Sequence, residues 1–310
     1  MNKNSPLFDL ENGYIVSDEN YYVCKGPNKS KITTKEVQKV LFEMVLELDR
    51  VFRKNNVGYA LAFGSSLGLY NYHGFIPWDD DVDIAIMYED LPKVIEALNN
   101  DLSSDYYFDC YEQNKKYNVF FPTIKVRKKN TEIKERVDFV MKNRIKGHNG
   151  LFIDIVALMG VNPILKKQYK LVKKAKRNVL VYSVLDIFGI QNKFIMEKMK
   201  KIEKETYEKY DDSEMIGQSP IIPYQDKSGG YIAYPRDIIL PFKEYDFNGH
   251  MLYSFNDIVS FSSLFYGQKC LKRWSEGKWI DPYPNKKRKP DHYRYIDLNT
   301  KKTRTKNGKP

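Results

Sequence analysis

The sequence predicts an α+β protein whose C-terminal part is mainly helical. Apolar residues repeat at helical spacing from 33 to 52, behind a capping box formed by Thr33 and Glu36. Short apolar runs, alternating or continuous, then predict strands at 59–63, 81–86, 106–111, 118–128 and 151–157. From Val161 to Tyr210 the pattern becomes helical and basic. Further helices are expected at 67–72, 89–100, 165–187, 193–210 and from 256 towards 267.

Length and composition limit the class of protein. A chain of 310 residues allows one large domain or two small ones, and 42% apolar residues are ample for a core. No run of about 18 apolar residues occurs, so no membrane-spanning segment is expected. Residues 1–10 are polar and lack the apolar core of a signal peptide, which favours a cytoplasmic location. Three scattered cysteines argue against a disulfide framework and against a zinc site.

Changes in composition divide the chain into four segments. Residues 1–32 are a loop-rich, extended lead-in, and 33–160 hold the predicted sheet. Residues 161–285 are helical at first and then rich in Pro and Gly. The change near residue 160 is compatible with a domain boundary, and equally with two lobes around one site.

The last segment, 286–310, is a strongly basic tail. It contains ten Lys or Arg residues and two Asp residues, so it carries +8 of the net charge of +11. The favoured interpretation is a solvated tail. The alternative is attraction to a phosphorylated glycan or, as a peripheral contact, to the inner face of an anionic membrane. A nucleic-acid partner is not expected, because no recognised binding module accompanies the charge.

The most informative stretch is an acidic run that opens a predicted strand, Asp81-Val82-Asp83-Ile84-Ala85-Ile86. Side chains alternate between the faces of a strand, so Asp81 and Asp83 are expected on one face. Two neighbouring carboxylates on an otherwise apolar strand repel each other and lose hydration. The pattern therefore predicts a bound cation, and oxygen ligands of this kind suit Mg²⁺ or Mn²⁺.

Two further elements complete a constellation for phosphate chemistry. Gly64-Ser65 follows the strand at 59–63, and a Gly-Ser turn at a helix start offers backbone N–H groups to a phosphate. Asp154 is the single acid of the buried strand at 151–157. This third acid either completes the metal site or takes a proton from a nucleophile. Phosphoryl transfer depends on such positioning and charge neutralisation.

This arrangement resembles the nucleotidyltransferase fold of the polymerase-β type, a mixed sheet flanked by helices. The matching pieces are Phe63-Gly64-Ser65, Asp81-Val82-Asp83 and Asp154. A longer match is sharper: residues 73–84, HGFIPWDDDVDI, resemble the signature of the LicD family of phosphocholine transferases, which includes the fukutin-type phospho-sugar transferases.

Weaker motifs extend the resemblance over roughly residues 36–292. Lys125-Val126-Arg127 resembles the family's basic strand, while residues 240–242 and 265–267 resemble its C-terminal motifs. The chain departs from the family at Gln268-Lys269, where many members have an acid or an aromatic residue. The resemblance therefore bears more on the type of reaction than on the identity of the substrate.

The resemblance implies transfer of a phospho-alcohol from a CDP-activated donor, with CDP-choline favoured, to a hydroxyl of a glycan or glycolipid. CMP would be released. Residues 33–160 would be a nucleotidyltransferase-like catalytic core, and 161–285 would complete the site. In this scheme Asp81, Asp83 and Asp154 hold the metal and form the catalytic set. Other side chains are expected to contact the donor or its phosphates: Gly64, Ser65, Lys125, Arg127, Trp78 and His73.

Some of these assignments have a structural alternative. Trp78 could face a choline ammonium by cation–π attraction, but packing that fixes the acidic loop is slightly preferred. His73 could contact phosphate or cap a turn. Asp79 and Asp80 are either outer ligands or loop charges.

Three other functions stay open at this point. An enzyme of the same fold could move ribitol- or glycerol-phosphate, and a true nucleotidyltransferase would transfer NMP to a small molecule or protein. A non-enzymatic glycan- or membrane-binding protein would instead depend on the basic tail, and its binding would not need the acidic residues.

Overall fold

The computed structural model describes residues 21–23, 31–117, 122–135, 148–187, 193–221, 231–275, 278–280 and 293–300. Its α-helices are α2 (Thr34–Lys54), α3 (Phe63–Tyr72), α4 (Leu91–Asp101), α5 (Leu165–Ile187), α6 (Lys193–Tyr210), α7 (Arg236–Ile239) and α8 (Ile258–Tyr266). Two 3₁₀ turns are η2 (Tyr88–Asp90) and η3 (Gln268–Cys270). The predicted helices at 165–187 and 193–210 are confirmed.

The described residues form one large sheet and three small ones. The strands of the large sheet are β3 (Ala60–Ala62), β4 (Asp83–Met87), β5 (Tyr106–Cys110), β6 (Ile124–Lys128), β8 (Phe152–Gly160), β9 (Met215–Gln218), β10 (Ala233–Pro235), β11 (Lys243–Phe247) and β12 (His250–Ser254). Small two-stranded sheets pair β1 (Tyr21–Val23) with β2 (Lys31–Thr33), β7 (Glu132–Glu135) with β15 (Tyr293–Asp297), and β13 (Arg273–Ser275) with β14 (Lys278–Ile280).

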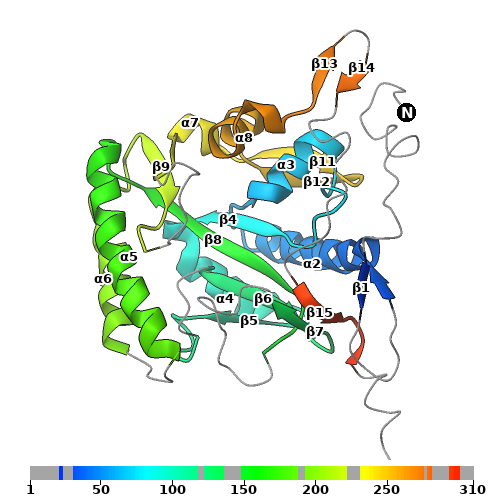
Figure 1. The fold of residues 1–310 in the computed structure, drawn as a ribbon, viewed down its shortest axis with the longest axis horizontal. Helices are drawn as coiled ribbons and strands as arrows, with labels where there is room; N and C mark the ends of the chain where they lie inside the picture. The colour runs from blue at the N-terminus through cyan, green and yellow to red at the C-terminus, as the bar shows by residue number, and fades with distance from the viewer. Residues whose placement is uncertain are drawn as a thin grey trace, which may run out of the picture.

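The large sheet is mixed and is centred on β8 (Figure 1). Strand β8 pairs in parallel with β4, which leads on to β3, β12 and β11. Its other edge is shared: β6 pairs antiparallel with the first half of β8, and β9 pairs with the end. The expected mixed sheet flanked by helices is confirmed, and the chain after residue 160 adds β9 to β12 to it.

Helix α2 covers one face of the sheet. The predicted capping box is present, because the Thr33 hydroxyl accepts from the Glu36 N–H and the Glu36 carboxylate accepts from the Thr33 N–H. The buried stripe of α2 packs against Val82, Ile84 and Ile86 in the main core. The opposite face of β4, including Ala85 and Met87, packs in a second cluster with aromatic residues of α3 and α8.

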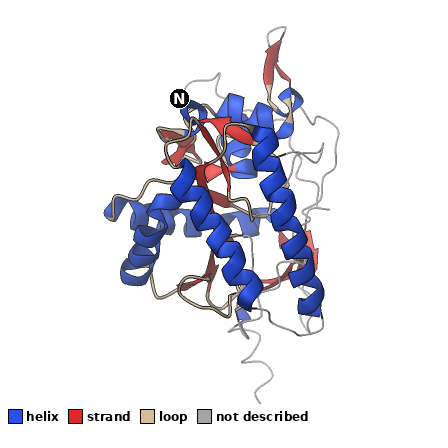
Figure 2. Cartoon of the chain, turned by 90° about the vertical axis from the view of Figure 1, so that its left-hand side faces the viewer, coloured by secondary structure: helices blue, strands red, loops and turns tan. Residues whose placement is uncertain are grey.

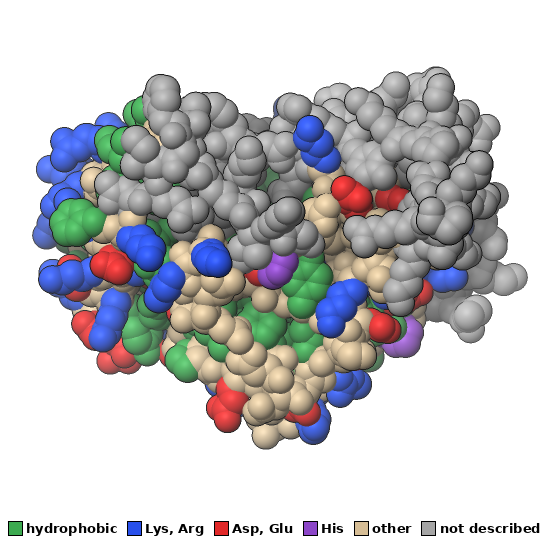
Figure 3. All heavy atoms as spheres, turned by 90° about the horizontal axis from the view of Figure 1, so that it is seen from below, with side chains coloured by type: hydrophobic (Ala, Val, Ile, Leu, Met, Phe, Trp, Pro, Cys, Tyr) green, Lys and Arg blue, Asp and Glu red, His purple; other side chains and the backbone are tan. Residues whose placement is uncertain are grey.

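The long helices α5 and α6 pack side by side at one end of the molecule and face the viewer in Figure 2. Their buried sides join two small clusters next to β8 and β9. Lys and Arg side chains are numerous on this end, which is on the left of Figure 3. Within the described residues, none of the helices combines the length and apolar composition needed to cross a membrane.

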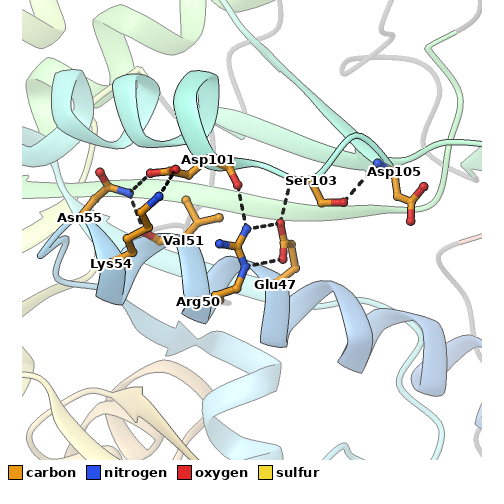
Figure 4. A network of polar contacts seen from close by, with 8 residues as sticks. All are labelled: Glu47, Arg50, Val51, Lys54, Asn55, Asp101, Ser103 and Asp105. Carbon is orange, nitrogen blue, oxygen red and sulfur yellow. Dashed lines mark hydrogen bonds and ion pairs between the residues drawn. The ribbon is translucent and has the colours of Figure 1, made fainter.

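A polar network fastens α2 to the loop after α4 (Figure 4). Arg50 donates to both carboxylate oxygens of Glu47, at 2.9 and 2.8 Å, and to the carbonyl of Asp101. The N–H of Ser103 donates to the same Glu47 carboxylate at 2.7 Å. These bonds, with the Arg50 hydrogen bond as the main cause, hold the pKa of Glu47 below its ordinary value.

The lowered pKa makes this network sensitive to acid. Replacing Glu47 with Gln is expected to reduce the free energy of unfolding at pH 7 by about 0.5–1 kcal/mol. A carboxylate with a lowered folded pKa stabilises the fold above its unfolded pKa and loses this effect as pH falls through the folded pKa. Urea unfolding of both proteins should therefore show a difference at pH 7 that shrinks as the pH is lowered below the ordinary pKa of a Glu carboxyl. A difference that grows on acidification would contradict this account.

Candidate active site

A row of charged residues crosses four strands at one level of the sheet. The strand registers place Asp83 of β4 beside Asp154 of β8, Asp154 beside Lys125 of β6, and Lys125 beside Asp109 of β5. Residues paired across neighbouring strands project from the same face. This row therefore lies on the face opposite α2, because Val82 and Ile84 on either side of Asp83 point into the α2 core.

The centre of the row is a buried ion pair. The Lys125 Nζ lies 3.2 Å from Asp154 Oδ1, and only 4% of the lysine side chain is exposed. The same ammonium lies 3.2 Å from the centroid of the Phe152 ring, which adds a cation–π contact. A buried charge is costly unless paired, so Lys125 and Asp154 depend on each other.

The start of α3 lies against the other end of the row. The Ser65 hydroxyl accepts from the backbone N–H of Asp83 at 3.1 Å, which ties α3 to the first residue of β4. Helix α3 begins at Phe63, whose φ of 47° turns the chain sharply after β3. The predicted turn is thus the first turn of the helix, and Gly64 lies in it.

Gly64 makes room for an acid. A Cβ atom added there would lie 2.9 Å from the Asp79 carboxylate and 4.0 Å from the hydroxyl of Tyr266. The absence of a side chain therefore lets Asp79 approach the N-terminal end of α3, where backbone dipoles favour negative charge.

Replacing Gly64 with Ala is expected to displace the Asp79 carboxylate while leaving stability almost unchanged. The atom that must move is the end of a side chain, and Ala favours a helix more than Gly does. A shift of this carboxylate should weaken Mn²⁺ binding, measured by titration calorimetry, about ten- to a hundredfold. Gly58→Ala is the matched control, since a Cβ there meets only Phe242 at 3.5 Å. Equal affinities for the two variants would be evidence against a role for Asp79.

The loop before β4 gathers three carboxylates. Each of Asp79, Asp80 and Asp81 offers a ligand oxygen within 4.8 Å of the others, and Asp80 is only 1% exposed. This is the acidic group that converges most closely among the described residues. From α2, the Gln38 amide donates to the carbonyls of Ile76 and Asp79, at 3.0 and 2.8 Å, and so fixes the loop backbone. An all-oxygen set of this kind fits Mg²⁺ or Mn²⁺.

Strand β4 begins two residues later than the sequence predicts. The regular strand starts at Asp83, and Asp81 belongs to the loop group with Asp79 and Asp80. The chain already lies beside β8 at Val82, because the N–H of Asp154 donates to its carbonyl at 3.1 Å. Asp83 and Asp154 are thus brought together by strand pairing, whereas Asp81 is positioned by the loop.

Trp78 and His73 make structural contacts at the edge of this region. The Trp78 ring packs edge-on against Tyr72, with centroids 6.5 Å apart. His73 ends α3 in the left-handed conformation at φ 51°, and its N–H donates to the carbonyl of Leu69. Its own carbonyl accepts from Asn248 at 2.7 Å, so its backbone links α3 to the turn between β11 and β12.

Arg127, which the sequence suggests as a phosphate ligand, lies within the fold. It is 1% exposed, and its Nε lies 3.4 Å from a carboxylate oxygen of the equally buried Asp109. Its Nη1 donates to the carbonyl of Gly150 at 2.9 Å. The imidazole of His148 lies 2.7 Å from the other oxygen of Asp109.

Several residues of this region are not identifiable from the sequence. Asp109 becomes a neighbour of Arg127 through the pairing of β5 with β6, and His148, in the loop before β8, contacts Asp109. The sequence gives no local signal for either residue. Gln38 belongs to a helix with no recognisable chemistry. Lys272, which is 5% exposed with its Nζ 4.3 Å from the Tyr72 ring, comes from the far C-terminal part.

Comparisons with known proteins find similarity over the part of the chain that carries these acidic residues. Residues 56–170 match the family described as LicD/FKTN/FKRP, nucleotidyltransferase domain. An uncharacterised protein of Rickettsia prowazekii is 35% identical over 80 residues, covering 25% of this chain and 30% of its own. A second one, from Rickettsia typhi, is 34% identical over 79 residues, covering 25% and 26%. The lipopolysaccharide cholinephosphotransferase LicD of Haemophilus influenzae is 24% identical over 82 residues, covering 26% and 31%.

The matched segments span no more than about a third of these relatives. Fold and site define an α+β protein with acidic groups gathered on one face of a mixed sheet, beside the start of a helix. The match over 56–170 includes α3, the acidic loop, β4 and β8. The match over residues 56–170 and the weaker similarity to the Haemophilus protein support membership of the LicD family.

Proposed function

We propose that the chain is a metal-dependent phosphotransferase with a nucleotidyltransferase-like core at 33–160, completed by residues 161–285. It moves phosphocholine, or a similar phospho-alcohol, from a CDP-activated donor to a hydroxyl of a cell-surface glycan and releases CMP. The matched Haemophilus relative is named for cholinephosphate transfer to lipopolysaccharide, which favours choline as the alcohol.

One observation carries the proposal. Asp83 and Asp154 are paired in register on adjacent parallel strands, next to the converging carboxylates of Asp79, Asp80 and Asp81. So many carboxylates at one place are unfavourable without positive charge. Lys125, which pairs with Asp154, is one such positive charge. A divalent cation bound by these oxygen ligands would add more positive charge at the same place.

The acidic residues and the first turn of α3 have different roles in the proposed reaction. Asp81, Asp83 and Asp154 would hold Mg²⁺ or Mn²⁺, which when bound neutralises the charge of the donor diphosphate. The first turn of α3, with Gly64 and Ser65, presents N–H groups to phosphate oxygens.

The bond changes need a proton acceptor. The acceptor hydroxyl oxygen bonds to the phosphorus of the transferred group, the P–O bond to CMP breaks, and the hydroxyl proton leaves. Asp154 would either take this proton or hold the metal, and Lys125 adds positive charge beside it.

The direct test is turnover with defined donors. The purified chain is incubated with Mn²⁺ or Mg²⁺, a panel of glycan acceptors, and CDP-choline, CDP-ribitol or CDP-glycerol in separate reactions. We expect CMP release matched by incorporation of the alcohol phosphate into the acceptor, and its loss with EDTA. If only CDP-ribitol or CDP-glycerol gave incorporation, the proposed reaction would stand, but the transferred alcohol would be ribitol or glycerol instead of choline. NMP incorporation from a nucleoside triphosphate would replace the proposal with a nucleotidyltransferase.

A further inference from the structure

The outer side of the α5–α6 pair carries exposed apolar residues. Leu180, Val181 and Val184 on α5 are 64%, 47% and 45% exposed, and Phe194 at the start of α6 is 73% exposed. We call these four residues the apolar stripe. Large aliphatic and aromatic side chains on a surface are informative when they are grouped rather than scattered.

The stripe is not the side of α5 that packs onto the protein. Val172, Ala175 and Tyr182 are buried and join the clusters that α5 forms with α6 and with the end of β8. At 100° per residue, Leu180 and Val184 lie on the opposite side of the helix from Ala175 and Tyr182, and Val184 also lies well away from Val172. Helix α5 therefore packs onto the protein through other residues, and the apolar stripe takes no part in that packing.

Basic residues continue the same side of α5 towards its N-terminus. Exposed Lys166, Lys170, Lys173 and Arg177 follow at helical spacing and lead directly into Leu180 and Val184. The helix contains seven Lys or Arg residues and a single acid, Asp186. On the left of Figure 3, Lys and Arg side chains lie beside exposed hydrophobic ones.

We propose that this side of the α5–α6 pair docks on an anionic lipid surface. Helices that lie on membranes combine apolar residues that enter the headgroup region with Lys and Arg that pair with anionic lipids. Each basic side chain near such a surface raises the partition coefficient about fivefold. A nucleic acid would use the charge but leave the aliphatic side chains exposed. A second copy of the chain would bring like charges together across the contact.

The proposal is independent of the phosphotransferase reaction, so its test measures binding. Full-length protein is sedimented with vesicles of phosphatidylcholine mixed with phosphatidylglycerol, and with vesicles of phosphatidylcholine alone. We expect binding to the anionic vesicles that weakens with added salt. Phe194→Ser should lower the partition coefficient about tenfold. Met251→Ser is the matched control, because Met251 is 53% exposed on β12, away from α5 and α6, and should bind as the parent does.

Charge is tested with a second matched pair of variants. Lys170, Lys173 and Lys174 are changed to Gln together, and the control changes Lys35, Lys39 and Lys116 to Gln, which are also exposed. Both variants have the same net charge, so only the position of the lost charges differs. The α5 variant should lose at least about tenfold in partition coefficient, and the control much less.

Four results would overturn the proposal. The parent could fail to bind anionic vesicles, or the α5 and α6 variants, with unchanged melting temperature, could bind as the parent does. Binding could depend only on the tail, shown by changing Lys301, Lys302, Arg304, Lys306 and Lys309 to Gln. Finally, size-exclusion chromatography could show a dimer that Phe194→Ser converts to monomer, which would make the stripe a contact between two copies.

Discussion

Replacing Asp83 with Asn is expected to lower the turnover of the protein about a hundred- to a thousandfold while the fold is kept. Asn has the size of Asp but lacks the negative charge that the proposed metal and donor require. The backbone N–H of Asp83, which binds the Ser65 hydroxyl, is unaffected by the change. The measurement is CMP release at saturating metal, with circular dichroism to confirm the fold.

Asp83 is a cleaner probe of the site than Asp154. Removing the charge of Asp154 would leave the buried Lys125 without its partner, so lost activity and lost stability would be mixed. Asp105→Asn is a suitable control, because Asp105 is exposed and lies before β5. Normal turnover in a folded Asp83→Asn protein would refute the proposed site and favour a non-enzymatic binding protein.

Replacing Arg127 with Met should act mainly on stability. Met fills a similar volume but leaves the carboxylate of Asp109, itself 2% exposed, without the guanidinium beside it. Breaking one side of a buried ion pair costs about 3–5 kcal/mol. Urea unfolding should show a loss of this size.

A double-mutant cycle separates a structural role of Arg127 from phosphate binding. If Arg127 serves to pair Asp109, Asp109→Asn together with Arg127→Met should cost much less than the two single changes added. If the sequence-based prediction of phosphate binding is right instead, Arg127→Met should stay stable and raise the KM for the donor.

The sequence predicts best what is encoded locally. The Thr33–Glu36 capping box is present, and the helices at 165–187 and 193–210 have the predicted bounds, because caps and helical periodicity act within a few residues. The strand at 151–157 is also found, extended to Gly160. Such signals need no knowledge of the rest of the chain.

Features that depend on distant pairing are not predictable in this way. Strands β9 to β12 lie in a region whose Pro and Gly content suggests loops, and they are stabilised as strands by joining both ends of the sheet. Strand β4 starts at Asp83 rather than Asp81, since the loop before it is held by Gln38 of α2. The alternation of apolar and polar residues along a strand carries no information about this contact with a distant helix, so it cannot predict where the strand begins.

The same limit applies to the site. The sequence identifies Ser65, Asp83 and Asp154, and the structure shows how strand register and one hydroxyl bring them together. The sequence also predicts that Lys125 and Arg127 lie on one strand face. It does not reveal that the Arg127 side chain forms an ion pair with Asp109. Burial of a charged side chain depends on its partners, and here those partners come from β5 and the loop before β8.

The Gln38 amide has a wider consequence for the way this protein responds to change. Helix α2 packs on the sheet face opposite the proposed site, yet one of its side chains holds the backbone of the acidic loop through two carbonyls. Any shift of the helix along its axis is transmitted to the carboxylates within a single side-chain length. If the acidic loop holds the proposed metal, mutations that loosen the interior beneath α2 are expected to change the metal affinity before the protein unfolds, and metal titration would then report on how well that interior is packed.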